Sequence, residues 1–88
     1  VARLPITQAS VLVVEDYPVN QVFARKLLQK FGFANIDLAE NGLQALALCE
    51  QRRYDMIFMD CQMPELDGFQ TTAQLRAKGL RTPIIAMT

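Results

Sequence analysis

The sequence predicts an α/β fold in which helices cover both faces of a parallel sheet. Four short apolar runs, each the length of one strand, alternate with three longer stretches that read as helices. The runs over residues 11–14, 55–60 and 83–87 end in, or are followed by, the acidic or hydroxyl residues Glu15, Asp60 and Thr88, at the place where open α/β sheets have their chemistry. Right-handed crossovers between successive strands make such a βαβαβαβ chain fold into a parallel sheet.

The first strand is predicted over residues 11–14, a continuous β-branched run that suits burial on both faces. Pro18 then stands where the first turn of a helix tolerates proline, and Gly32 supplies the end of that helix. The apolar residues of this stretch recur at helical spacing and form one face of an amphipathic helix; they are Val19, Val22, Phe23, Leu27 and Phe31.

The second strand is predicted over residues 35–39, where apolar and polar side chains alternate, as is typical of an edge strand. Asn41 and Gly42 begin a second helix, which continues to Cys49. A third strand, buried like the first, is predicted over residues 55–60.

The segment over residues 61–66 contains a proline and is predicted to be an irregular loop. Asp67 is the expected N-cap of a third helix, which starts sharply at Gly68 and ends at Gly79. Residues 83–87 form the fourth apolar strand.

Length and composition indicate one domain of 88 residues, with residues 1–9 as a linker remnant and residues 10–88 as the folded unit. Nine basic and nine acidic residues cancel, so no overall field attracts nucleic acid or an acidic membrane. The absence of histidine excludes a histidine zinc site and a histidine general base. Cys49 and Cys61 lack metal-ligand spacing, and neither a signal peptide nor a membrane span is evident, so we expect a cytoplasmic setting.

Carboxylates stand at the ends of the two buried predicted strands, which a parallel sheet can place side by side. Glu15 and Asp16 follow the first strand, and Asp60 closes the third. At a separation of ~5 Å and an effective dielectric of ~20, each like-charge pair costs roughly 3 kcal/mol. A bound cation relieves this repulsion, and Mg²⁺ prefers oxygen ligands together with retained waters. The sequence therefore predicts a Mg²⁺ site at this edge of the sheet.

Each residue of this site has an expected role. Asp16 and Asp60 are the natural direct ligands of the metal, Glu15 acts through a water, and the backbone carbonyl of Gln62 adds a further oxygen. Asp60 is also a carboxylate nucleophile for a phosphoryl donor, and Thr88 donates a hydrogen bond to a phosphoryl oxygen. Taken singly, a strand-end aspartate is usually solvated or caps a helix, so the joint arrangement carries the prediction.

Five motifs carry a family resemblance, and they lie at residues 11–16, 41–42 with 45–46, 54–60, 63–69 and 82–88. On these motifs the chain, from about residue 10 to residue 88, resembles the receiver domain of two-component signalling proteins. The resemblance implies a flavodoxin-like, doubly wound parallel sheet with strand order 2-1-3-4. It also implies that Asp60 is the phosphoacceptor, Glu15 and Asp16 the acidic metal-binding pair, Gln62 a backbone ligand and Thr88 the switch hydroxyl.

The resemblance further implies a partner. A histidine kinase or a histidine-containing phosphotransfer domain would donate the phosphoryl group, docking beside Asp60 through the first helix at Val19 and Asn20. Asn20 and residues 23–28 are similar to receivers attached to hybrid sensor histidine kinases. Whether the parent chain is such a kinase, and therefore an enzyme and part of a membrane-bound sensor, stays open.

The chain departs from the family pattern at its C-terminal side. A complete receiver carries a fifth strand that ends in a lysine, with flanking helices, and none of these elements is present before Thr88. Lys26, Lys30 and Lys78 are predicted to lie in helices and cannot replace that lysine. We therefore expect a receiver truncated after the fourth strand, whose uncovered edge favours oligomerisation.

Three other functions stay open at this stage. A degenerate receiver would serve only as an interaction module, which the retention of all three acids disfavours. A phosphohydrolase with an aspartyl nucleophile typically needs a second aspartate two residues on, where this chain has Gln62. A flavodoxin-like cofactor site needs a phosphate-cradling loop after the first strand, whereas Glu15 and Asp16 would repel phosphate.

Overall fold

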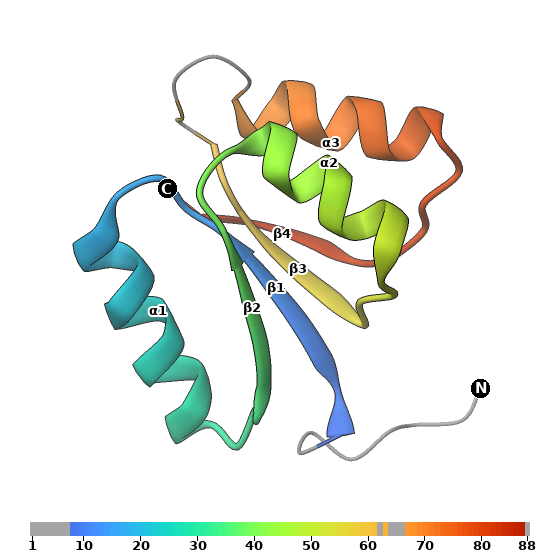
Figure 1. Ribbon diagram of the computed structural model, residues 1–88. Coiled ribbons are helices and arrows are strands. Elements are labelled where there is room, and N and C mark those ends of the chain that lie inside the picture. The colour runs from blue at the N-terminus through green and yellow to red at the C-terminus, as the bar shows by residue number, and fades with distance from the viewer. Residues whose placement is uncertain (1–7, 62, 64–66, 88) are drawn as a thin grey trace.

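The computed structural model describes residues 8–61, 63 and 67–87, and within them the elements follow the predicted order (Figure 1). All strand pairs are parallel, and the sheet order is β2-β1-β3-β4, as predicted. None of the helices in this part of the chain is long and apolar enough to cross a bilayer. The elements are β1 (Ser10–Val14), α1 (Pro18–Lys30), β2 (Asn35–Ala39), α2 (Gly42–Gln51), β3 (Met56–Asp60), α3 (Gly68–Ala77) and β4 (Ile84–Met87).

The sheet separates two apolar cores. Helices α2 and α3 lie on one face and α1 lies on the other (Figure 1). Strand β1 serves both cores, because Leu12 and Val14 belong to the α2–α3 side whereas Val11 and Val13 belong to the α1 side. All four side chains are fully buried, which explains why this strand reads as a continuous apolar run.

Local signals fix the helix ends where the sequence placed them. The side chain of Asn41 accepts a hydrogen bond from the backbone N–H of Gln44 at 2.8 Å and caps α2. Asp67 and Gln70 form a reciprocal capping box at the start of α3, at 2.8 and 3.1 Å. Gly79, just after α3, adopts a φ of 91°, a backbone conformation that favours glycine.

The apolar face of α1 is mostly exposed, although an amphipathic helix ordinarily turns such a face towards the core. Val19, Phe23 and Phe31 are each about two-thirds exposed, at 65%, 68% and 66%. The residues of α1 that contact the sheet core are instead Leu28, which is 7% exposed, and the half-buried Ala24. Because α1 is the one helix on its side of the sheet in the described residues, its contact strip is narrower than its apolar face.

Candidate metal and phosphoacceptor site

The three predicted carboxylates, Glu15, Asp16 and Asp60, lie together in the structure, and we call them the acidic cluster. Strands β1 and β3 are adjacent and in register, with Val14 opposite Met59, so the residues that follow Val14 lie beside the end of β3. Glu15, Asp16 and Asp60 each offer a carboxylate oxygen, and these three atoms lie within 4.8 Å of one another. This separation is close to the ~5 Å for which the repulsion of each like-charge pair was estimated from the sequence.

Backbone and side-chain hydrogen bonds fix the turn that carries the first two acids. The N–H of Glu15 donates to the carbonyl of Ala39 at 3.0 Å, so Glu15 is still held by the neighbouring strand. The N–H of Tyr17 donates to Glu15 Oε2 at 3.4 Å. Gln21, in the first turns of α1, donates through Nε2 to the backbone carbonyl of Glu15 at 2.6 Å.

Gln21 is a site residue that the sequence analysis missed. It lies six positions after the carbonyl that it binds, and nothing in its surroundings distinguishes it from a solvent-facing helical glutamine. Only the angle between β1 and α1 brings its amide to the Glu15 carbonyl. The hydrogen bond ties α1 to the acidic turn.

Close packing fixes the third acid. A Cβ atom added to Gly68 would lie 2.1 Å from the backbone oxygen of Asp60 and 2.9 Å from Cys61 Cα. The first residue of α3 therefore has no room for a side chain, and the helix begins directly against the end of β3. This contact gives Gly68 a steric role in addition to the sharp helix start that was predicted.

Electrostatics within the cluster favour a bound cation. The pKa of Glu15 is raised from its ordinary 4.5 to about 7, chiefly by burial and also by contacts with the side chains of Asp60 and Asp16. Hydrogen bonds from Asn20 and from the backbone of Tyr17 oppose this rise but do not cancel it. A set of carboxylate oxygens with one nearly buried member fits a hard divalent cation such as Mg²⁺.

Two predicted site residues, Gln62 and Thr88, lie outside the described residues, so their roles stay predictions. Lys26 and Lys30 lie in α1, as predicted. Lys78 is the C-cap residue just after α3, rather than a residue within the helix, and its Nζ lies 2.6 Å from Glu50 Oε1.

Comparisons with known proteins agree with this geometry. The model of the response regulator receiver domain family matches residues 11–88. Two-component system protein A of Emericella nidulans is 49% identical over 80 residues, which cover 89% of this chain and 12% of that protein. Hybrid signal transduction histidine kinase A of Dictyostelium discoideum is 43% identical over 79 residues, covering 89% of this chain and 4% of that protein. The chain therefore spans only a small part of these relatives.

Solved structures show the same fold. The receiver domain of the sensor histidine kinase PA1611 from Pseudomonas aeruginosa PAO1, solved with a magnesium ion in its active site cleft, matches with a TM-score of 0.84 and 44% identity. That match covers 91% of this chain and 66% of the solved chain. The receiver domain of the histidine kinase CKI1 from Arabidopsis thaliana, complexed with Mg²⁺ and BeF3⁻, matches with a TM-score of 0.80 and 36% identity, covering 92% and 66%. With its acidic cluster at the ends of β1 and β3 and its family match over residues 11–88, this chain belongs to the response regulator receiver domain family.

Proposed function

We propose that this chain accepts a phosphoryl group on Asp60 from a phosphohistidine, with Mg²⁺ bound by the neighbouring acids, and thereby acts as the receiver of a phosphorelay. The observation that carries the proposal is the convergence of three carboxylate oxygens within 4.8 Å at the ends of two adjacent strands. The half-buried Asp60 lies at the tip of β3, where a donor can reach its carboxylate.

The transfer would exchange one bond to phosphorus for another. An Asp60 carboxylate oxygen attacks the phosphorus, the P–N bond to the donor imidazole breaks, and the imidazole leaves with the electron pair and takes up a proton. The product is an aspartyl phosphate. Mg²⁺, held by Glu15, Asp16 and Asp60, would neutralise charge on the cluster and on the phosphoryl oxygens.

The proposed donor is a histidine kinase or a histidine-containing phosphotransfer domain. The N-terminal turn of α1 follows directly after Asp16 and carries Val19, which is 65% exposed. An exposed apolar residue beside a reacting centre suits a docking contact. The relatives include a hybrid kinase, which supports a receiver attached to such a kinase. The cytoplasmic placement is part of the proposal and rests on no comparison.

A degenerate receiver that serves only as an interaction module is the second candidate. The exposed apolar face of α1 favours an interaction role, but an interaction module has no need of three repelling carboxylates. The two candidates differ in whether Asp60 reacts.

Phosphorylation of Asp60 can be tested by intact-mass spectrometry after incubation with acetyl phosphate and Mg²⁺. In the full-length domain, we expect the wild-type protein to gain one phosphoryl group and the Asp60→Asn variant to gain none. Asp55→Asn is the matched control, because Asp55 lies immediately before the first residue of β3, at the end of the strand away from Asp60. This variant should label like the wild-type protein. Labelling of Asp60→Asn at a single other site would contradict the assignment.

Metal binding can be tested separately. Asp16→Asn should weaken Mg²⁺ binding while leaving the metal-free fold intact or slightly more stable, because one repulsive charge is removed. The relief is at most roughly 3 kcal/mol per close pair. Titration calorimetry measures the first effect and urea unfolding the second. If Asp16→Asn unfolds the metal-free protein, the acids are structural and the metal proposal fails.

A further inference from the structure

A second concave site lies at the opposite end of the sheet from the acids. The groove, which we call the basal groove, has a volume of about 680 Å³ and is lined by residues at the C-terminal ends of α2 and α3 and in the loops that lead into β3 and β4. Figure 1 shows where these elements lie. Its lining includes the apolar side chains of Leu46, Leu75 and Leu80 together with Tyr54, Arg53 and Arg81. None of them belongs to the acidic cluster.

The apolar part of the basal groove is continuous with the core. Leu46, Tyr54 and Leu75 are nearly buried members of the α2–α3 core, and Leu80 packs against the same cluster. A ligand in the groove would therefore rest on well-packed apolar side chains. The volume lies within the range of roughly 300–1,000 Å³ that is typical of sites for small organic molecules.

Side-chain hydrogen bonds hold the α3–β4 loop in place. The hydroxyl of Thr82 donates to the carbonyl of Tyr54 at 3.1 Å, which joins this loop to the α2–β3 loop. Arg76 Nη1 donates to the carbonyls of Leu80 and Thr82, both at 2.9 Å. The groove is therefore largely formed before a ligand arrives, which lowers the entropy cost of binding.

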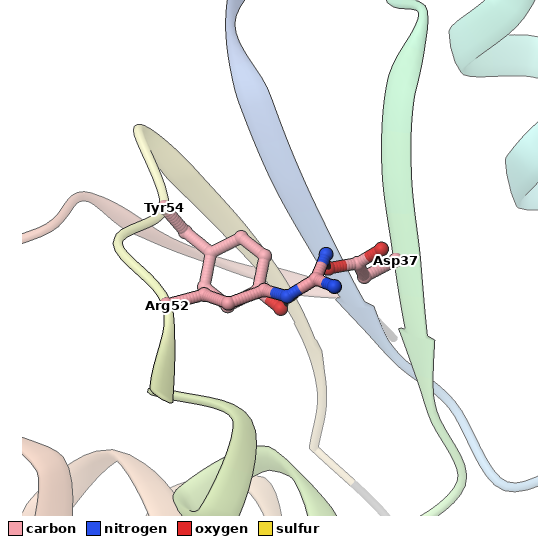
Figure 2. Close-up of polar contacts among 3 residues, drawn as sticks. All are labelled: Asp37, Arg52 and Tyr54. Atoms are coloured by element: carbon pink, nitrogen blue, oxygen red, sulfur yellow. Dashed lines mark hydrogen bonds and ion pairs between the residues drawn. The ribbon is translucent and has the colours of Figure 1, made fainter. Parts of the chain in front are cut away.

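The α2–β3 loop is fixed from the other side by Asp37 of β2 (Figure 2). Asp37 Oδ2 accepts from the hydroxyl of Tyr54 at 2.7 Å and pairs with Arg52 Nη1 at 3.0 Å. The charge of Arg52 is therefore balanced by Asp37 and is not counted among those that could bind a ligand.

The remaining charged groups leave the basal groove with an excess of positive charge. Lys78 is paired with Glu50 at 2.6 Å. Asp55 also lines the groove and keeps its negative charge, because the backbone N–H of Ser10 that donates to it at 2.7 Å is a neutral group, so two arginines remain against one carboxylate. Arg53 and Arg81 line the groove from its two different loops, are exposed, and have no carboxylate within ion-pair distance among the described residues. Two guanidinium groups beside an apolar floor suit a ligand that has both an anionic and an apolar part.

We propose that the basal groove binds a small organic anion, namely an apolar body of one or two rings that carries a carboxylate. The carboxylate would pair with Arg53 and Arg81, and the apolar body would cover Leu46, Leu75 and Leu80. The proposal does not depend on phosphorylation of Asp60, because the two sites share no residue.

The test is an NMR titration of the ¹⁵N-labelled full-length domain with biphenyl-4-carboxylate. We expect saturable amide shifts within residues 49–55 and 78–82. Arg53→Gln and Arg81→Gln should each weaken binding by about tenfold, the usual effect of losing one hydrogen bond to a charged group. The uncharged analogue biphenyl-4-methanol should bind the wild-type chain more weakly by a similar factor.

Arg25→Gln is the matched control, because Arg25 is an equally exposed arginine on α1, across the sheet from the groove. It should bind the carboxylate with unchanged affinity. Three outcomes would overturn the proposal: shifts that centre on the exposed apolar face of α1, equal binding of the acid and the alcohol, or no saturation at millimolar probe. The amide spectra also report whether each variant is folded.

Discussion

At the scale of single residues, the acidic cluster is arranged at a cost to stability. Glu15 is 7% exposed, and both burial and its acidic neighbours disfavour its charged form. The hydrogen bond from Gln21 to the Glu15 carbonyl and the close approach of Gly68 to Asp60 hold the acids together despite their repulsion. The cluster is therefore prepared for a cation by the packing around it.

The raised pKa of Glu15 makes metal-free stability depend on pH. Between the unfolded value of 4.5 and the folded value of about 7, the folded state holds a proton that the unfolded state has lost. The resulting stabilisation is fully present below about pH 4.5 and is lost as the pH rises through about 7.

Urea unfolding without Mg²⁺ should show this contribution as a fall in unfolding free energy between pH 5 and pH 8. Glu15→Gln should flatten the fall, whereas Glu40→Gln, at an exposed position outside the cluster, should keep it. A wild-type profile that rises over this range would contradict the assignment.

At the scale of elements, two features affect the site in different ways. The close contact between the start of α3 and the end of β3 sets the position of Asp60. The exposed apolar face of α1 leaves side chains in solvent beside the acidic turn, where a partner can cover them.

Gly68→Ala should strongly destabilise the fold, because its Cβ would lie 2.1 Å from the Asp60 carbonyl oxygen, and backbone on both sides has to move. Overpacking of this kind costs about 3 kcal/mol or more when the neighbour is rigid. Gly79→Ala is the control: its Cβ would meet nothing within 4 Å, so it should cost only about 1 kcal/mol for the left-handed conformation. Chemical denaturation compares the two. Similar losses would show that the close contact relaxes freely.

Val19→Lys should slow phosphotransfer from a histidine phosphotransfer domain by about tenfold or more, as expected for a central contact residue. Labelling by acetyl phosphate should be unchanged, because the small donor does not touch the helix surface. Gln29→Lys is the matched control, since Gln29 is exposed on the same helix about 15 Å away. Stopped-flow mixing and gel assays measure the two rates. Equal loss with both donors would place Val19 in the reacting site.

At the scale of the whole molecule, the sheet is unevenly protected. Strands β1 and β3 are paired on both sides, whereas β4 pairs only with β3 among the described residues. Strand β4 is apolar, yet Ile85 is 41% exposed. The solved receivers that match are longer, and this chain covers 66% of each of the two described above.

The 88-residue chain alone should therefore associate through β4, since an apolar strand edge pairs readily with another chain. Sedimentation velocity should show mass that rises with concentration, and labelling at Asp60 should be poor. Extending the chain by about 30 to 40 residues, enough for a further βα unit with its preceding helix, should give a monomer that labels well. Ile85→Lys should reduce association of the short chain. A stable monomer that labels at the rate of the extended chain would contradict this prediction.

The sequence by itself determined the element order and the strand ends at which the three acids stand. These features follow from local periodicity, from caps such as Asn41 and Asp67, and from the rule that parallel strands end at one edge. The strand order, and with it the adjacency of β1 and β3 that brings the acids together, was implied by the resemblance to receiver domains. Only the tertiary structure decided that the apolar face of α1 is exposed, that Gln21 holds Glu15, and that Arg53 and Arg81 share a groove. The physical reason is that periodicity gives the character of each helix face but not its neighbours. Contacts between distant residues depend on the angles and distances at which whole elements pack.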